Sequence, residues 1–198
     1  MPQHLIIVTG CPGSGKSQFA ARLIRHFASF ELLSYDTLKE EYFDRFGFNS
    51  LEEREALNDR SLDTFYQLLS GAMEKGGDLV IEYPFCRKHA AELRRLIGTY
   101  GYQALTVLLT GDMKVLYQRG KTRNRDTARH PGHLVSVYHK GVPVREQDYI
   151  RPVSFPDFLA DCRKKDYNIQ IGPTVTVDMT APDRLDYTTV FSEIQALL

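Results

Sequence analysis

The residues best suited to chemistry stand near the amino terminus, between Gly10 and Ser17. They read Gly-Cys-Pro-Gly-Ser-Gly-Lys-Ser, which is the spacing G-x-x-x-x-G-K-S. Glycines let the backbone turn tightly and direct several N–H groups at one anion. We expect Lys16 to reach the β- and γ-phosphates of a nucleoside triphosphate and Ser17 to bind Mg²⁺. The predicted nucleotide contacts are Gly10, Pro12, Gly13, Ser14, Gly15, Lys16, Ser17 and Gln18.

The segments on both sides of this loop favour a phosphate site. Residues 5–9 form a short apolar, β-branched run, which predicts a buried strand. Residues 16–29 carry apolar side chains at helical spacing, and the start of such a helix offers free N–H groups and a positive dipole end. We interpret Cys11, inside the loop, as a small filler and not as a nucleophile.

Two acidic residues are expected just after further strands. Asp36 follows the predicted strand 31–34, where its carboxylate could orient an attacking hydroxyl and accept its proton, or could cap the next helix. Glu82 lies at the end of the predicted strand 78–83, a place typical of an acid that holds Mg²⁺ or orients Ser17. Because glutamate is longer than aspartate, Glu82 could instead contact the acceptor.

A basic segment, residues 119–153, follows the fourth predicted strand. Arg119 and Arg123 are four residues apart and so share one helical face, and Arg125 and Arg129 repeat this spacing. Arginines that close over a transferring phosphoryl group stabilise its charge. With few large apolar residues, the segment predicts a flap or lid that adds nothing to the core. We expect Arg119 and Arg123 to act on the phosphates, although a solvated basic face would show the same pattern.

Two histidines in this segment raise the question of a metal site. His130 and His133 flank a Pro-Gly pair, and no cysteine or acidic cluster stands beside them in the sequence. A structural zinc site needs four ligands of these types. The pattern therefore favours a turn that shapes the lid, and the metal ligands we predict are Ser17 and Glu82.

Strand-like and helical segments alternate along the chain. The predicted strands are residues 5–9, 31–34, 78–83, 103–110 and 174–178. Alternation of this kind predicts a parallel sheet between two layers of helices, with ligands at the carboxyl ends of the strands. A chain of 198 residues is long enough for one full core, so we expect a single domain over residues 1–198.

Composition excludes several classes of protein. The 25 basic and 25 acidic residues balance, which argues against a large basic groove for nucleic acid. Three cysteines without paired spacing are typical of a reducing cytoplasm. No apolar run is long enough to span a membrane and no leader pattern is evident, so we expect a cytoplasmic protein.

Together these motifs resemble the P-loop kinase superfamily. The resemblance rests on the loop 10–17, Asp36, Glu82, the pair Arg119 and Arg123, and the end strand Val177-Asp178-Met179-Thr180. The chain is most similar to the small "predicted kinase" ATPases of AAA type, which resemble the kinase domain of phage polynucleotide kinase, zeta toxins and chloramphenicol phosphotransferase. This resemblance implies a three-layer P-loop NTPase fold with a five-stranded parallel sheet in the order 2-3-1-4-5.

The resemblance also implies an activity. ATP with Mg²⁺ would donate its γ-phosphoryl group to a hydroxyl, with Lys16, Asp36, Arg119 and Arg123 as the catalytic residues. Glu82 departs from the aspartate common at its place. We therefore expect an ATP-dependent kinase, a phosphotransferase whose acceptor is a small molecule or a nucleotide that the sequence does not identify.

Two other functions stay open. One is a nucleotide-dependent regulatory ATPase or switch, which would hydrolyse ATP slowly without an acceptor. The other is a polynucleotide 5′-end kinase, which needs a basic track along the strand that the neutral total charge disfavours. A monomer and a homodimer are equally compatible with the sequence.

Overall fold

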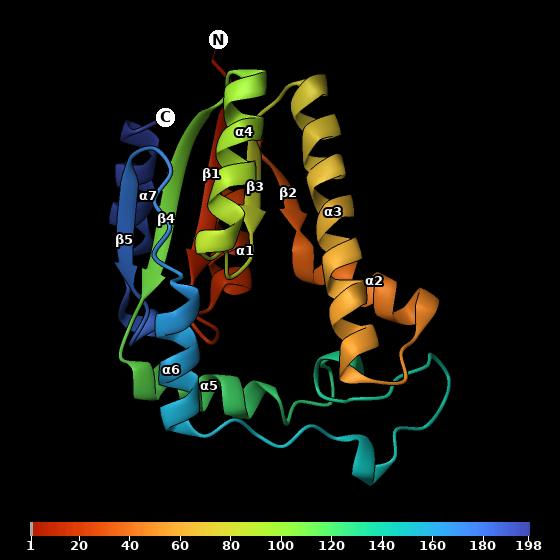
Figure 1. Cartoon of the computed structure of the whole chain (residues 1–198). Coiled ribbons are helices and arrows are strands. Elements are labelled where there is room, and N and C mark those ends of the chain that lie inside the picture. The colour runs from red at the N-terminus through yellow and green to blue at the C-terminus, as the bar shows by residue number, and fades with distance from the viewer. Residues whose placement is uncertain (1) are drawn as a thin grey trace.

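The computed structural model describes residues 2–198, with a parallel five-stranded sheet at the centre (Figure 1). The strands are β1 (His4–Gly10), β2 (Glu31–Ser34), β3 (Leu79–Glu82), β4 (Gln103–Thr110) and β5 (Thr174–Asp178). Their order is β2-β3-β1-β4-β5, which confirms the predicted order. The register places Val8 of β1 beside Glu82 on one side and Val107 on the other. The acid at the end of β3 is thereby brought to the edge where β1 leads into the glycine-rich loop.

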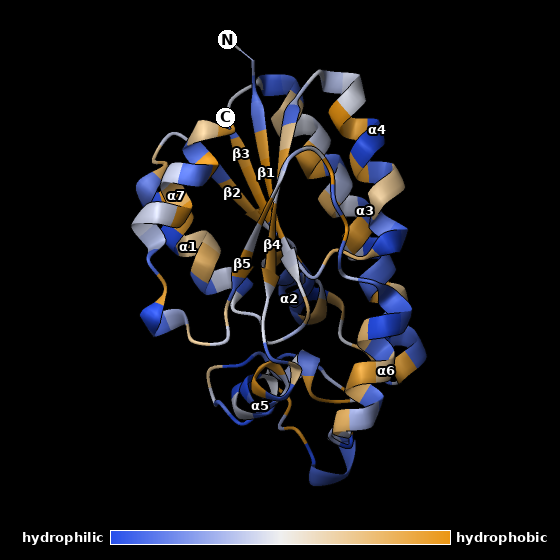
Figure 2. Ribbon diagram, turned by 90° about the vertical axis from the view of Figure 1, so that its left-hand side faces the viewer, coloured by the Kyte–Doolittle hydropathy of each residue, from blue (hydrophilic) through white to orange (hydrophobic). Residues whose placement is uncertain are grey.

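Helices cover both faces of the sheet (Figures 1 and 2). They are α1 (Lys16–His26), α2 (Tyr35–Phe46), α3 (Leu51–Lys75), α4 (Ala90–Tyr100), α5 (Met113–Arg123), α6 (Phe155–Lys165) and α7 (Tyr187–Ala196). Short 3₁₀ turns span Arg87–His89, Pro131–His133, Glu146–Asp148 and Pro182–Arg184. Across residues 2–198, no helix has both the length and the apolar character needed to cross a bilayer.

The alternation of side chains along β1 divides the core into two parts. Leu5 and Ile7 face a cluster with α3 and α4, whereas Ile6 and Val8 face a cluster with α1 and α7. Successive side chains of a strand point to opposite faces, so a strand covered on both sides is apolar throughout. Figure 2 shows the consequence as a hydrophobic sheet between helices with hydrophilic outer faces.

The chain between α5 and α6, residues 124–154, crosses below the sheet to reach α2 and then returns to α6 (Figure 1). We call this segment the strap. Its Tyr138 pairs with Phe48 through two backbone hydrogen bonds of 2.8 Å. Val135 and Tyr138 are buried in a third apolar cluster with Phe43 and Phe48. The expectation that this part of the chain adds nothing to a core is therefore wrong.

Candidate active site

The glycine-rich loop connects β1 to α1 and folds around the side chain of Lys16. Lys16 is buried, and its Nζ donates hydrogen bonds to the carbonyl oxygens of Gly10 (3.1 Å) and Cys11 (3.0 Å). Gly15 is the N-cap of α1 and provides no side-chain cap. The first N–H groups of α1 are therefore free to bind an anion.

Gly13 brings this loop against α5. Its φ is +84°, in the left-handed region, and a Cβ at this position would lie 2.2 Å from the carbonyl oxygen of Leu116. Leu116 belongs to α5 and is buried. Only glycine therefore allows the loop to approach the helix this closely.

Burial changes the protonation of Lys16. It lowers the pKa of the ammonium group to about 8, although the nearby carboxylates of Glu82 and Asp36 act in the opposite direction. Desolvation disfavours the charged form of a buried amine. Lys16 therefore titrates close to neutral pH unless phosphate groups add negative charge beside it.

This titration predicts a pH-dependent affinity for nucleotide. Phosphates bind the protonated amine, so AMPPNP affinity should fall as pH rises above about 8, by at most about tenfold per pH unit until the pKa of the complex is reached. Titration of AMPPNP between pH 7 and 9.5 measures this slope. The guanidinium of Lys16→Arg stays charged throughout, so its profile should be flat. A flat profile for the wild type would contradict the lowered pKa.

Glu82 accepts two hydrogen bonds that link β3 to its neighbours. Its Oε1 receives the hydroxyl of Ser17 (3.3 Å) and that of Ser34 (2.9 Å). Burial, and then repulsion from Asp36, raise the pKa of the Glu82 carboxyl. Sequence reasoning missed Ser34. The available signal in the sequence was the Ser34 hydroxyl at the end of β2, two residues before Asp36. In the structure the Ser34 side chain does not cap α2.

The site offers ligands for Mg²⁺ and not for zinc. Mg²⁺ prefers oxygen ligands and usually keeps several waters, so the Ser17 hydroxyl and the Glu82 carboxylate suit an ion that arrives with nucleotide phosphates. In the described chain, no group of three or more His, Cys, Asp or Glu side chains could hold a metal ion. His130 and His133 each contact a carboxylate of α2, at 3.0 Å from Asp44 and 2.7 Å from Glu40.

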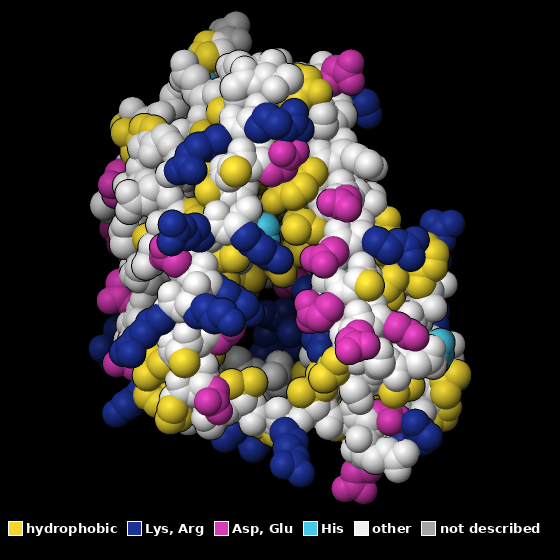
Figure 3. Space-filling model, viewed as in Figure 1, with side chains coloured by type: hydrophobic (Ala, Val, Ile, Leu, Met, Phe, Trp, Pro, Cys, Tyr) yellow, Lys and Arg dark blue, Asp and Glu magenta, His cyan; other side chains and the backbone are white. Residues whose placement is uncertain are grey.

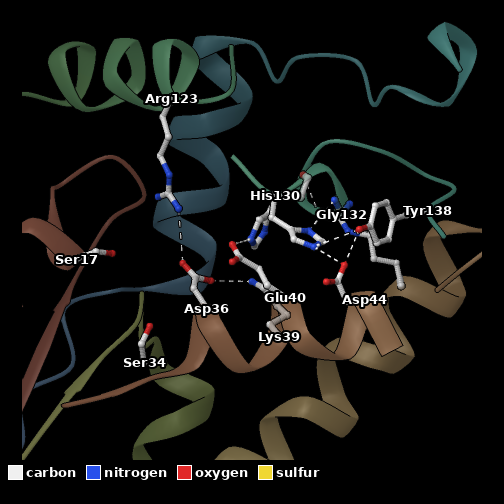
Figure 4. Close-up of polar contacts among 12 residues, drawn as sticks. Ser17, Ser34, Asp36, Lys39, Glu40, Asp44, Arg123, His130, Gly132 and Tyr138 are labelled. Carbon is white, nitrogen blue, oxygen red and sulfur yellow. Dashed lines mark hydrogen bonds and ion pairs between the residues drawn. The ribbon is translucent and has the colours of Figure 1, made fainter. Parts of the chain in front are cut away.

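Asp36 lies in the first turn of α2, where two basic side chains approach it (Figure 4). One carboxylate oxygen is 3.0 Å from Lys39 Nζ, and the other is 3.8 Å from Arg123 Nη2. Burial alone would raise the pKa of Asp36, but the charges of Lys39, His133 and Arg123 lower it to about 2. Asp36 is therefore a carboxylate at any physiological pH.

The structure separates the two arginines that the sequence pairs. Arg119 donates hydrogen bonds to the carbonyl oxygens of Met179 (2.5 Å) and Thr180 (2.8 Å), in the loop after β5, whereas Arg123 points to Asp36. Because α5 ends at Arg123, the spacing of Arg125 and Arg129 does not place them on the same helical face. That part of the spacing argument is wrong.

One cavity of about 1040 Å³ connects these groups. Its lining includes Pro12, Gly13, Gly15, Lys16, Ser17 and Gln18 at one end, and Asp36, Lys39, Tyr83, Arg129 and His133 at the other. Of the predicted nucleotide contacts, Gly10 and Ser14 are buried and do not line it. Figure 3 shows the molecule hollowed on this side, with basic side chains inside the hollow and acidic ones along one rim.

A protein-family model described as an AAA domain (AAA_33) matches residues 5–136. The chain belongs to this AAA domain family. The matched part of the AAA domain contains the glycine-rich loop, Asp36, Glu82 and Arg123, and it ends inside the strap. The remainder of the strap, α6, β5 and α7 lie outside the match.

Solved structures share the complete fold of this AAA domain protein. A presumed kinase from Chloroflexus aurantiacus is 24% identical with a TM-score of 0.79, covering all of both chains. Shikimate kinase from Bacteroides thetaiotaomicron is 16% identical (TM-score 0.59; 98% of this chain and 97% of that one). APS kinase from Mycobacterium tuberculosis, solved with AMPPNP and APS, is 18% identical (TM-score 0.55; 100% and 98%). The search of curated proteins found no match. The fold is that of the P-loop kinases.

Proposed function

We propose that this protein is an ATP-dependent kinase that transfers the γ-phosphoryl group to a hydroxyl of a small molecule or nucleotide. The observation that carries the proposal is the single cavity in which the phosphate loop faces Asp36, with Arg123 beside that carboxylate. Transfer needs a donor site and a group that orients the acceptor hydroxyl, and this cavity offers candidates for both. The printed names of the structural neighbours, which are kinases, agree with this choice.

In this proposal each side chain has one task. Lys16 leaves the carbonyl groups of its own loop and binds the β- and γ-phosphates, together with the N–H groups of α1. Ser17 and Glu82 would hold Mg²⁺, which supplies charge neutralisation on the phosphate oxygens when bound. Arg123 balances the charge that builds up between donor and acceptor.

Asp36 orients the acceptor hydroxyl and takes its proton. With a pKa of about 2, the carboxylate is a weak base before the reaction starts. The hydroxyl becomes acidic as its oxygen bonds to the phosphorus, so we propose that the proton moves to Asp36 late in the transfer. Phosphoryl transfer depends mainly on positioning and charge stabilisation, and a weak but well-placed base is sufficient for it.

The strap and Arg119 complete the proposal. We propose that residues 119–153 act as the lid and that residues 1–198 work as one domain. Arg119 would bind phosphate only by releasing the carbonyl groups of Met179 and Thr180. In its observed position it fixes the loop after β5 against α5.

A transfer screen tests the proposed function. The protein with radiolabelled ATP and Mg²⁺ is offered nucleosides, nucleotides, sugars, antibiotics and 5′-hydroxyl oligonucleotides. We expect labelling of one acceptor class well above ATP hydrolysis, and its loss in Lys16→Met. ATP hydrolysis without any labelled acceptor would contradict the kinase and favour the regulatory ATPase. Labelling of oligonucleotides that weakens with salt would favour the 5′-end kinase.

A further inference from the structure

One arginine at the acceptor end of the cavity lacks partners of its own. Arg129 lies in the strap and lines the cavity with Asp36 and His133. Its Nε and Nη1 atoms are buried and have no hydrogen-bond partner among residues 2–198. Buried polar groups are normally paired, and an orphaned charged group is costly, so this guanidinium calls for an explanation.

The carboxylates closest to Arg129 are already engaged. Asp36 contacts Lys39 and Arg123, and Glu40 contacts His133. Among residues 2–198, no carboxylate forms an ion pair with Arg129 within 4.0 Å. Around Asp36 the cavity lining combines Lys39, Arg123 and Arg129 with two acids, Asp36 and Asp126, so the balance of charge is positive and favours an anionic ligand.

The phosphates of the nucleotide do not account for this arginine. They are expected at the glycine-rich loop, where Lys16 and the N-terminus of α1 bind them. The charged groups that act on Arg129 are instead Arg123, Asp36, Glu40 and Arg54, and none of them belongs to that loop. Arg129 lines the same cavity as Asp36 and His133 and lies outside the glycine-rich loop, which leaves it available to an acceptor bound at Asp36.

Guanidinium has a geometry that selects its ligand. Its planar fork of N–H donors matches the two oxygens of a carboxylate or a phosphate, and such paired contacts are stronger than neutral hydrogen bonds. Lys39, at the same end of the cavity, adds a second positive charge beside the acceptor. Tyr83 contributes an aromatic surface to the same end.

We propose that Arg129 binds an anionic group of the acceptor, so that the acceptor is a hydroxyl compound that also carries a carboxylate or a phosphate monoester. The inference rests on the proposed kinase function and names the substrate class of that same site. The anionic group binds to the guanidinium of Arg129, with Lys39 nearby. The hydroxyl of the same molecule then lies at Asp36, facing the γ-phosphate.

Binding of three matched probes tests this subsite without requiring transfer. Glycerol 3-phosphate, glycerate and glycerol share a short polyol and differ in the anionic group. Each is titrated by calorimetry into protein saturated with AMPPNP and Mg²⁺, so that the phosphate loop is occupied. We expect at least one of the two anions to bind and glycerol not to bind. Preference between the two anions distinguishes a phosphate from a carboxylate acceptor.

Substitutions at Arg129 test whether the anionic probe binds at this residue. Arg129→Gln should lower the affinity for the anionic probe by about tenfold or more, because a charge-assisted contact is lost. Arg129→Lys, which keeps the positive charge, should retain part of this affinity. Arg163→Gln, an exposed change on α6, serves as the matched control and should bind as the wild type does. Because Nε and Nη1 of Arg129 have no partner in the part of the chain that the structure describes, Arg129→Gln should unfold at the same temperature as the wild type or higher.

The outcomes separate the two proposals. Failure of AMPPNP to bind would contradict the proposed kinase function itself. If AMPPNP binds, then equal binding of glycerol and the anions, no binding of any probe, or an unchanged affinity in Arg129→Gln would each overturn the anion subsite while leaving the kinase standing. A lower unfolding temperature for Arg129→Gln would show instead that Arg129 has a structural role.

Discussion

Replacing Asp36 by asparagine should lower kcat for phosphoryl transfer by about 10²–10⁴-fold, the range measured for positioned acids and bases. The amide keeps the shape of the side chain but cannot accept the proton of the acceptor hydroxyl. It also removes the negative charge that holds Lys39 and Arg123 in place. The affinity for AMPPNP should change little, because Asp36 lies beyond the phosphate loop. Single-turnover transfer and AMPPNP titration measure the two effects separately.

The neighbouring surface of the same helix provides the control. Glu41→Gln removes one negative charge from the exposed face of α2, and it should leave both transfer and nucleotide binding unchanged. Since the pKa of Asp36 is about 2, its ionisation should produce no step in the rate between pH 5 and 9. Transfer by Asp36→Asn at the wild-type rate would show that the acceptor is oriented by another group.

Replacing Gly13 by alanine should destabilise the protein and weaken nucleotide binding together. An alanine at φ +84° is strained, and its Cβ would lie 2.2 Å from the Leu116 carbonyl oxygen, so we expect a loss of at least about 2 kcal/mol in the free energy of unfolding. The loop must move to relieve the overlap, which displaces the N–H groups proposed to bind phosphate. We expect AMPPNP affinity to fall by about tenfold or more, as several charge-assisted contacts weaken.

Gly98 provides the control for the substitution of Gly13. Gly98 is exposed within α4, and a Cβ there meets no atom within 4 Å. Gly98→Ala should therefore raise the free energy of unfolding by up to about 1 kcal/mol, the helix propensity difference, and leave AMPPNP binding intact. Denaturant unfolding and AMPPNP titration of both variants measure the free energy of unfolding and the nucleotide affinity. Equal stability of Gly13→Ala and the wild type would mean that the loop does not pack on α5 as described.

The sequence predicted best those features that local chemistry determines. The spacing of the glycines and Lys16 was sufficient to predict the glycine-rich loop between β1 and α1. The apolar runs 5–8 of β1 and 79–81 of β3 require cover on both faces, which leads to a three-layer architecture. Asp36 and Glu82 could be placed at the same edge because parallel strands end together there.

What the sequence did not predict depends on contacts between distant segments. The hydroxyl of Ser34 turns to Glu82, 48 residues away, instead of capping its own helix. The direction of Arg119 is determined by carbonyl groups of the loop after β5, 60 residues away. The docking of the strap depends on Val135 and Tyr138, two apolar side chains that a basic, weakly periodic segment conceals.

One face of α2 has a mechanical consequence. Asp36, Glu40 and Asp44 are four residues apart, and each contacts chain from α5 or the strap: Arg123, His133, and then Tyr138 at 2.6 Å. The strap is thus tied to α2 through His133 and Tyr138, while its two ends continue into α5 and α6 (Figures 1 and 4). A lid held at these points would open by breaking its contacts with the carboxylates of α2 rather than by swinging freely on one hinge.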